Sequence, residues 1–347
     1  MPMAKSTISD VARRANVSIA TVSRYLNKSS FITNDKVRAI EEAIFELGYK
    51  KSAKSKKNHA ERKMRIGVVG YAFHDLWVSQ LLSGINEEVK KRKHTISLET
   101  SLATNPKDLM NLKILSDNDI DGFIFLGGSF SDDIGHIDSE IPILLVGHDN
   151  MINNWPTINI DNELGGYIAT NYVIQNGHKV IAHICGPQHL KDGRDRLLGY
   201  KRALKTAGIA FDSTLVVDGY YETKHGLWQA QALLKNRPDI TAIFCANDLC
   251  AFGAIQGLHQ IGYKVPDDVS IVGFDDMLMA DVFIPRLTTI RQPSFELGEL
   301  AIKMLFDIID GRKLDHKVPK VTLVERDSVR PNEAPTMPPS VTHFRLS

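Results

Sequence analysis

The sequence predicts an α/β protein with an N-terminal helix-turn-helix headpiece and a larger, two-lobed body of doubly wound type. Two observations carry this prediction. The first fifty residues place apolar side chains at helical spacing in three short stretches. From about Met64 onward, short apolar runs alternate with helical stretches in two successive series. The length of 347 residues exceeds that of one ordinary domain and suffices for two to three cores.

The first helix of the headpiece is expected over Ile8–Ala15, where apolar residues recur at helical spacing. Asn16 is expected to adopt the turn conformation that ends this helix. Ser18 is placed to cap a second helix over Ile19–Leu26, because its side-chain oxygen can accept from the free amides of the first turn. Thr33 is placed to cap a third helix that is expected to run through Leu47. Two short helices joined by a tight turn and braced by a third are typical of a helix-turn-helix.

The second helix presents polar side chains where a DNA-binding helix would need them. Val22 and Leu26 are expected to face inward. The side chains left outward or at its leading end are those of Ile19, Ala20, Thr21, Ser23 and Arg24. Short or basic donors fit phosphates and base edges, and small apolar groups fit thymine methyls. The alternative is a small helical bundle with a solvated polar face.

The charge distribution favours the DNA-binding interpretation. Residues 1–63 hold 14 Lys and Arg against 6 Asp and Glu, a net charge of +8. The remaining residues hold 28 against 35, a net charge of −7. A basic front end on an acidic body is typical of a segment that binds a polyanion. For residues 50–63 taken alone, a solvated run of charge is the alternative.

The composition is that of a soluble globular protein, with 43% hydrophobic and 24% charged residues. The chain start has no apolar run of signal-peptide length, and no run approaches a membrane span, so we expect a cytoplasmic protein. Cys185, Cys245 and Cys250 stand in apolar surroundings, which favours small buried side chains over a metal site or a disulfide. Neither a metal nor a cofactor is predicted.

The headpiece closely resembles that of the LacI/GalR family of bacterial transcription repressors. The resemblance lies in "TISDVARRANVSIATVSRYLN" and "VRAIEEAIFELGY". It implies that Ile19 and Ala20 discriminate between operators. The full set of DNA-binding residues that it implies is Thr7, Ser18, Ile19, Ala20, Thr21, Ser23, Arg24, Asn27, Tyr49, Lys54, Lys57 and Asn58.

The linker, residues 50–63, departs from the family pattern. In the family this stretch forms a hinge helix on DNA, and a leucine on it wedges into the minor groove. The corresponding position here is Asn58, and the surrounding chain is rich in lysine. We therefore predict a hinge that relies more on phosphate contacts than on intercalation, with affinity that falls steeply with salt. An Asn58→Leu change that left operator affinity and bending untouched would count against this alignment.

The body is expected to contain parallel sheets with ligands at the carboxyl ends of the strands. The first series of strands is "RIGVVGYA", "TISLETSL", "GFIFLGG" and "PILLVGH", with helices near Trp77–Lys91 and Pro106–Leu115. The second is "TINID", "VIAHICG", "LVVDG", "AIFCAND" and "VSIVGFDD", with helices near Gly165–Gln175, Arg194–Ala207, Lys224–Leu234 and Ala251–Ile261. No P-loop, dinucleotide, zinc-protease or nucleophile-elbow motif occurs, so we expect a binding protein and not an enzyme.

The resemblance to the LacI/GalR family continues through the body, over about residues 6–330, most specifically in "PDDVSIVGFDD". Family members are similar to periplasmic sugar-binding proteins fused to a DNA-binding headpiece. The implied layout is a headpiece over residues 1–49, a basic hinge over 50–63, an effector-binding and dimerisation body over 64–330 and a disordered tail over 331–347. The near lobe would span about 64–161 and 293–318, and the distal lobe about 162–289 and 321–330.

The resemblance also implies an effector site. Arg196 would clamp a hydroxyl or carboxylate, Asp275 would accept from hydroxyls or ring nitrogens, Asn247 would add a contact, and Tyr221 would offer a stacking face. Candidates in the near lobe are Phe73, Asp75, Trp77 and His148. Each distal-lobe residue has a structural alternative: Asp275 could cap a loop, Asn247 could cap the following helix, and Tyr221 could be a core aromatic.

Together these residues predict a homodimeric repressor of a carbohydrate-utilisation operon. Two headpieces would bind a pseudo-palindromic DNA operator, and a sugar or sugar derivative would release it. The alternatives are a regulator with a purine-type corepressor and a regulator controlled by a protein partner. The proline-rich tail has no leucine heptads, so we expect no tetramer-forming helix.

Overall fold

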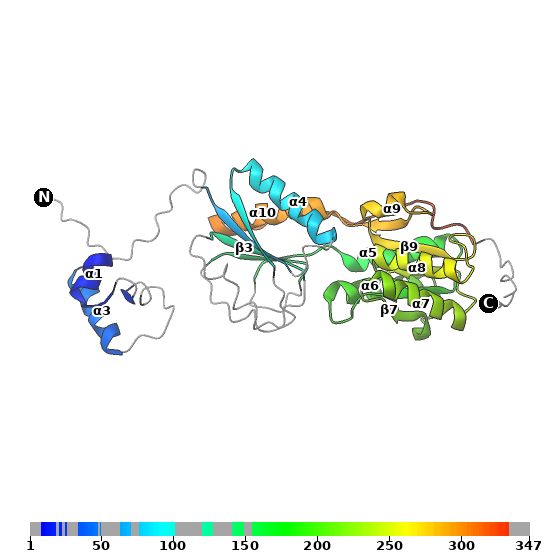
Figure 1. Cartoon of the computed structure of the whole chain (residues 1–347), viewed down its shortest axis with the longest axis horizontal. Coiled ribbons are helices and arrows are strands. Elements are labelled where there is room, and N and C mark those ends of the chain that lie inside the picture. Colours follow the sequence, from blue (N-terminus) through cyan, green and yellow to red (C-terminus); the bar gives the residue numbers. More distant parts are fainter. Residues whose placement is uncertain are drawn as a thin grey trace, which may run out of the picture. The chain divides into compact units, whose positions relative to one another are not determined.

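The computed structural model describes residues 8–18, 21–22, 25, 34–47, 49, 63–70, 76–100, 120–127, 141–148 and 155–332. The chain divides into two compact units, Met1–Arg62 and Lys63–Ser347, which are described separately below. Figure 1 shows the elements of each unit.

The headpiece unit is helical. Its described elements are α1, Ile8–Arg14, and α3, Asn34–Glu46, and between them Thr21, Val22 and Tyr25 also have helical conformation. Its core consists of Val11, Ala12, Ala15, Val22, Ile40 and Ala43. Burial of Val22, with a fully covered side chain, confirms the inward orientation expected from the apolar spacing.

The first sheet of the body, in the near lobe, is entirely parallel, with the strand order β2-β1-β3-β4-β5. The strands are β1 Arg65–Gly70, β2 Thr95–Thr100, β3 Gly122–Leu126, β4 Ile143–Val146 and β5 Thr157–Ile158. Helices α4, Leu76–Lys91, and α10, Ser294–Asp310, pack against each other over this sheet (Figure 1). The chain thus returns to its first lobe after completing most of the second.

Glycines allow α4 and α10 to approach closely. A Cβ atom added at Gly84 would lie 1.9 Å from the carbonyl oxygen of Phe295. A Cβ atom added at Gly298 would lie 2.2 Å from the carbonyl oxygen of Leu81. Because backbone atoms cannot yield as a flexible side chain can, the pair packs in this geometry only with glycine at both positions.

The second sheet, in the distal lobe, has the order β11-β10-β9-β8-β6-β7 and is parallel except for β11, which pairs antiparallel with β10. Its strands are β6 Ile181–Cys185, β7 Val216–Asp218, β8 Ala242–Cys245, β9 Ser270–Asp275, β10 Thr288–Arg291 and β11 Thr322–Val324. The helical elements are α5 Asn162–Gln175, α6 Lys191–Thr206, η4 Ser213–Leu215, α7 Thr223–Asn236, α8 Asp248–Gln260 and α9 Leu278–Val282. Two sheets of this kind confirm the doubly wound fold.

Alternating side chains of the second sheet pack into two separate cores, as the pleat requires. On β9, Val272 and Phe274 lie in the core with α5 and α6, whereas Ile271 lies in the core with α7 and α8. On β8, Phe244 and Ile243 divide in the same way. Helices therefore cover both faces of this sheet.

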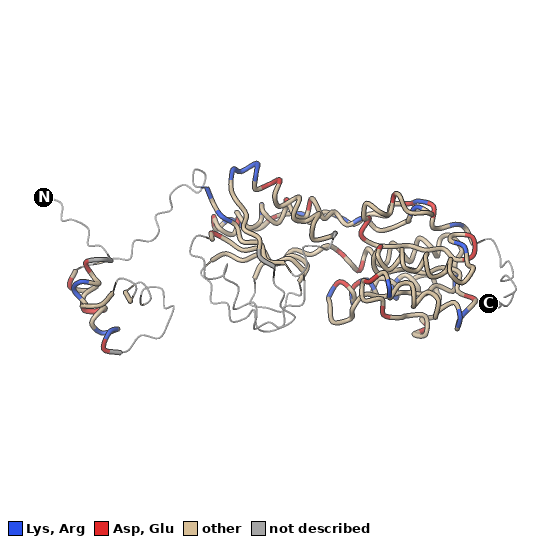
Figure 2. Tube along the Cα trace, viewed as in Figure 1, with Lys and Arg blue, Asp and Glu red and all other residues tan. Residues whose placement is uncertain are grey.

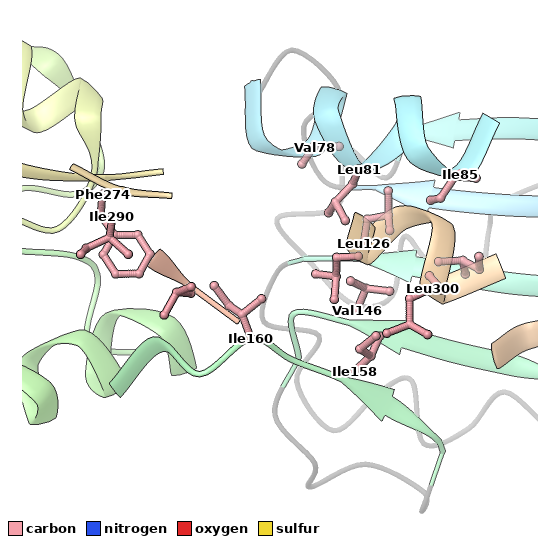
Figure 3. Close-up of a cluster of buried hydrophobic side chains, with 14 of the residues drawn as sticks. Val78, Leu81, Ile85, Leu126, Val146, Ile158, Ile160, Phe274, Ile290 and Leu300 are labelled. Atoms are coloured by element: carbon pink, nitrogen blue, oxygen red, sulfur yellow. The ribbon is translucent and has the colours of Figure 1, made fainter. Parts of the chain in front are cut away.

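One buried cluster includes side chains from both sheets. Figure 3 shows Phe274 and Ile290 of the second sheet on one side, Leu126 and Val146 of the first sheet on the other, and Ile160 between the two pairs. Ile160 follows β5 in the segment where the chain passes from the first sheet to α5. The connection between the lobes is thus part of the hydrophobic core.

The structure also bears on other features that the sequence led us to expect. The cysteines are free and buried, as predicted. The expected helix Pro106–Leu115 lies outside the described residues. Helices α5, α6 and α8 each begin three residues before their expected starts. Within the described part of the chain, no helix is both long and apolar enough to cross a membrane.

Candidate functional site

The turn before the second headpiece helix has the geometry that the sequence predicts. Asn16 has a φ of +50°, in the left-handed region that asparagine tolerates. The backbone amide of Thr21 donates to Oγ of Ser18 at 3.1 Å, and the two hydroxyls lie 2.8 Å apart. Ser18 therefore caps the helix. Both Ser18 and Thr21 were also predicted to contact DNA, and that role stays a prediction.

Tyr49 packs against the headpiece core and is partly buried. Its backbone amide donates to the carbonyl of Ile44, so it closes the end of the third helix. Its predicted DNA contact stays a prediction. The other predicted DNA-binding residues lie outside the described ones: Thr7, Ile19, Ala20, Ser23, Arg24, Asn27, Lys54, Lys57 and Asn58.

The described headpiece helices carry both signs of charge (Figure 2). Their charged residues are Arg13, Arg14, Lys36 and Arg38 against Asp10, Asp35, Glu41, Glu42 and Glu46. The basic excess of residues 1–63 therefore resides in other residues, including Arg24 and the linker lysines. On α3 the acidic residues outnumber the basic ones, which disfavours this helix as the surface that faces phosphates.

Arg196 on α6 is the centre of the candidate effector site. Its side chain is only 5% exposed, and its guanidinium lies 3.7 Å from the centre of the Phe274 ring. Nε donates to Oδ1 of Asn162 at 2.9 Å, and Nη1 donates to the carbonyl of Ala246 at 2.5 Å. These contacts tie the cation to α5 and to the end of β8, which explains how a buried arginine is held in place.

The backbone of Arg196 is held as firmly as its side chain. A Cβ atom added at Gly166 of α5 would lie 2.3 Å from the Arg196 carbonyl oxygen, and one added at Gly199 would lie 2.1 Å from the Glu163 carbonyl oxygen. Helices α5 and α6 thus touch through their backbones. This contact fixes the position from which the Arg196 side chain starts.

Tyr221 lies next to Arg196, with its ring centre 5.5 Å from the guanidinium carbon. Its hydroxyl donates to Oδ2 of Asp192 at 2.8 Å. A Cβ atom at Gly186 would lie 2.3 Å from Cζ of the ring, so the ring rests directly on the turn after β6. Burial raises the pKa of the Tyr221 hydroxyl well above its ordinary value, although the Arg196 charge opposes the shift; the phenol therefore remains a donor.

Asn247 is the N-cap of α8. Its Oδ1 accepts from the backbone amide of Cys250 at 2.9 Å, and its Nδ2 donates to the carbonyl of Tyr221 at 3.1 Å. Both ends of the amide are engaged within the protein. The capping alternative raised from the sequence is thus present, and the predicted effector contact of Asn247 stays a prediction.

Asp275 ends β9 and points toward Arg196, with Oδ1 3.7 Å from Nη1. It has a φ of +115°, and the following residue, Asp276, has a φ of +57°. Asp276 forms ion pairs with Arg291 at 2.6 Å and with Arg326 at 2.7 Å. These pairs hold two consecutive residues with positive φ and so aim the Asp275 carboxylate.

A third carboxyl, that of Asp248, is fully buried beneath this turn. It accepts from Oγ1 of Thr289 at 2.6 Å and from the backbone amide of Met277 at 2.8 Å. Burial, and then the charge of Asp275, raises the pKa of Asp248 well above its ordinary value. Gly273 makes room for it, because a Cβ there would lie 2.3 Å from Oδ1.

In the near lobe, Trp77 and His148 lie near the ends of β3 and β4. The Trp77 ring covers Gly127 and Gly147, where added Cβ atoms would lie 3.3 and 3.1 Å from it. His148 is 2% exposed, and its carbonyl accepts from Nδ2 of Asn159 at 2.9 Å. Their effector contacts stay predictions. Phe73 and Asp75 lie outside the described residues.

Arg196, Tyr221 and Asp275 therefore meet at the carboxyl ends of three adjacent strands, β6, β8 and β9. Sequence reasoning missed Asn162, Asp192 and Gln292, which contact members of this group. The spacing of Asp192 and Arg196, four residues apart on one helix, is the signal that could have found Asp192.

Comparison with known proteins identifies both parts of the chain. Residues 7–52 match bacterial regulatory proteins of the lacI family, and residues 170–329 match a periplasmic binding protein-like domain. The HTH-type transcriptional repressor PurR of Pectobacterium atrosepticum is 33% identical over 330 residues, which cover 93% of this chain and 97% of that protein. The HTH-type transcriptional regulator RegA of Clostridium saccharobutylicum is 32% identical over 328 residues, 93% of this chain and 99% of that protein.

Among solved structures, the transcriptional regulator CelR–cellobiose complex has a TM-score of 0.71 and 29% identity, and covers 93% of this chain and 100% of that chain. The similarity spans the headpiece, the linker and both lobes. The resemblance found in the sequence is thereby confirmed, and so is the fold class. The chain belongs to the LacI family of bacterial regulatory proteins.

Proposed function

We propose that the protein is a homodimeric transcriptional repressor that binds a pseudo-palindromic DNA operator and releases it when a sugar or sugar derivative binds between the lobes. It would act as a regulator and not as an enzyme. Full-length similarity to a transcriptional repressor supports the DNA-binding part. A regulator that binds operator DNA would act where that DNA lies, so a cytoplasmic location is part of the same proposal.

The observation that carries the sugar assignment is the group formed by Arg196, Tyr221 and Asp275. A buried guanidinium, an aromatic ring and a carboxylate converge at the carboxyl ends of parallel strands. Such a group orients hydroxyls with charged donors and acceptors and covers a ring with an aromatic face. The similarity to a regulator in complex with cellobiose supports the same class of ligand.

A purine-type corepressor is the second candidate. The identity with repressors named PurR, at 33%, exceeds that with the cellobiose-bound regulator, at 29%. An arginine, a carboxylate and an aromatic ring also suit a heterocycle. The two candidates predict opposite effects of the ligand on operator affinity. A corepressor tightens operator binding, whereas an inducer weakens it. Control by a protein partner is the third candidate.

The domain layout is part of the proposal. Residues 1–49 would read the operator, and residues 50–63 would contact phosphates as a hinge. Residues 64–330 would bind effector and dimerise through two lobes with the boundaries given above. The body would exist in an equilibrium between an open and a closed state. Ligand and DNA would each shift that equilibrium, and this coupling would link the two binding sites.

Helix α9 and the segment after it support a homodimer. Leu278 is 86% exposed, Val282 67% and Ile284 90%. Three large apolar side chains so close together on a surface are unfavourable in water and are typical of an interface. A second copy of this chain is the proposed occupant, since two headpieces held together would bind the two half-sites of the proposed pseudo-palindromic operator.

Sedimentation velocity tests the dimer. Leu278→Glu combined with Ile284→Glu should shift the wild-type dimer to monomer, because two charges would be buried in the contact. The control is Leu198→Glu, at an exposed leucine on α6 that is 51% exposed. A double variant that sediments like the wild type would exclude this surface.

Operator binding tests the function. Fluorescence anisotropy with an operator fragment at fixed salt is measured with and without a panel of sugars, sugar phosphates and purines. A compound that weakens binding by about 5- to 150-fold supports the inducible repressor. A compound that tightens binding supports the corepressor instead. DNA binding that no compound affects would favour a protein partner.

A further inference from the structure

The distal-lobe half of the site contains more negative than positive charge. Arg196 is its cation, and two carboxylates face it: Asp275 at 3.7 Å from Nη1 and Asp192 at 4.0 Å from Nη2. Two other carboxyl groups nearby are left out of this comparison of charge. Asp276 is paired with two arginines, and Asp248 is buried beneath the turn.

The hydrogen bonds of Arg196 leave one nitrogen for a ligand. Nε and Nη1 donate to Asn162 and to the carbonyl of Ala246. Among the described residues, Nη2 has no hydrogen-bond acceptor; the Asp192 oxygen, at 4.0 Å, is beyond hydrogen-bond distance. This donor is not among the buried, unsatisfied side-chain atoms of the described residues, so a ligand hydroxyl can reach it.

Asp192 is the most exposed member of this group. Its side chain is 36% exposed, compared with 14% for Asp275 and 5% for Arg196. The Tyr221 hydroxyl donates to Oδ2 of Asp192, so this carboxylate both orients the ring and carries charge. Because an ionised carboxylate has about four acceptor positions, one such bond leaves others for ligand hydroxyls.

We propose, on the basis of the proposed function, that the effector is an uncharged, hydroxyl-rich ligand. Phosphorylated ligands are rejected, and Asp192 determines this preference. A hydroxyl oxygen accepts from Nη2 of Arg196, while hydroxyl hydrogens are donated to Asp192 and Asp275. One neutral molecule then makes a hydrogen bond with each of the three charged groups.

A phosphate ester fits the same place poorly. It carries a charge of about −1.5 to −2 at neutral pH and only acceptor oxygens. Bound to Nη2 of Arg196, it would lie close to two carboxylates, and nothing on it could donate to them. Like charges at such separations in a partly desolvated site repel strongly. The cation that would attract it is already balanced by Asp192 and Asp275.

Asp192→Asn isolates the charge, because asparagine retains an oxygen that can accept from the Tyr221 hydroxyl. Asp195→Asn is the matched control: Asp195 lies on the same helix, and Lys191 is its ion-pair partner. Isothermal titration of the full chain uses matched pairs of a sugar and its phosphate, such as glucose with glucose 6-phosphate and fructose with fructose 1-phosphate. Cellobiose and hypoxanthine complete the set.

The expected result is that the wild type binds the neutral member of a pair at least about 10-fold more tightly than its phosphate. Asp192→Asn should reduce that preference several-fold, and Asp195→Asn should leave it unchanged. Tighter binding of a phosphate by the wild type, or equal effects of the two substitutions, overturns the inference while the repressor function stands. Binding of hypoxanthine alone, or of no compound while the operator still binds, overturns the sugar assignment itself.

Discussion

Gln292 donates a hydrogen bond from Nε2 to Oδ1 of Asp275 at 2.5 Å. Gln292 is 6% exposed and lies between β10 and α10, where the chain passes back to the near lobe. The Asp275 carboxylate of the candidate site is therefore hydrogen-bonded to the segment that connects the lobes.

Gln292→Ala should weaken effector binding by roughly 10-fold or more, because a hydrogen bond to a charged group contributes about 1.5 kcal/mol or more. Isothermal titration with the compound identified by the operator measurement checks this. Gln231→Ala is the control, since its amide bonds the carbonyl of Gly257 and the side chain of Gln260 on α8. Equal affinities in wild type and Gln292→Ala would show that Asp275 needs no such support.

Ser18→Ala should destabilise the second headpiece helix by about 1 kcal/mol, because the Thr21 amide loses its side-chain acceptor. Hydrogen exchange of the headpiece amides in the full chain measures this loss of helix stability, and the measurement requires no DNA. Ser18→Asp retains an acceptor and should retain protection. Unchanged exchange in Ser18→Ala would mean that the cap contributes nothing to the helix.

Gly298→Ala should destabilise the body by about 1–3 kcal/mol or more, because its Cβ would lie 2.2 Å from the Leu81 carbonyl oxygen. Chemical denaturation of the full chain measures the change. Ser83→Ala, at an exposed residue of α4, should change stability far less. A Gly298→Ala protein as stable as wild type would contradict the close packing of α4 and α10.

His183 makes stability depend on pH. It is fully buried between Tyr200 and Phe244, Nδ1 lies 2.9 Å from the Phe244 carbonyl, and Nε2 has no partner among the described residues. Burial lowers the pKa of His183 to about 4. Since the unfolded chain binds the proton near pH 6.5, this group's stabilising effect is complete above that pH and is lost as pH falls toward 4.

His183→Leu should therefore flatten the decline in stability between pH 6.5 and 4, by on the order of 2–3 kcal/mol. Denaturation at several pH values measures the slope. Burial also lowers the pKa of His178, so the stability of the variant should still decline somewhat with falling pH. A variant with the wild-type slope would show that His183 does not contribute.

Local sequence signals predicted the headpiece turn and the identity of the strands. Asn16 and Ser18 act through their own neighbours, so the pattern alone determines where the turn and the cap lie. The starts of α5, α6 and α8 were placed too late because each expected helix was begun where its apolar stripe begins, and the first turn was left out. Asp161 accepts from the Leu164 amide, and Asn247 accepts from that of Cys250, so each cap lies four residues before the expected start of its helix.

The same error concealed Asp192. With α6 expected from Arg194, Asp192 stood outside the helix, and its relation to Arg196 was not apparent. Asn162 and Gln292 could not be found from local pattern in any case. Their contacts span 34 and 17 residues and arise only when the sheet brings its strand ends together.

The hydrogen bonds of the Arg196 side chain affect how such a site can be redesigned. This side chain donates to Asn162 of α5 and to the carbonyl of Ala246, so replacing it would remove contacts within the protein as well as a contact with the ligand. Asp192 stands in the first turn of the same helix, and its side chain is partly exposed. Changes of ligand preference should therefore be sought at Asp192 and around the Tyr221 ring, with the arginine left in place as a fixed anchor.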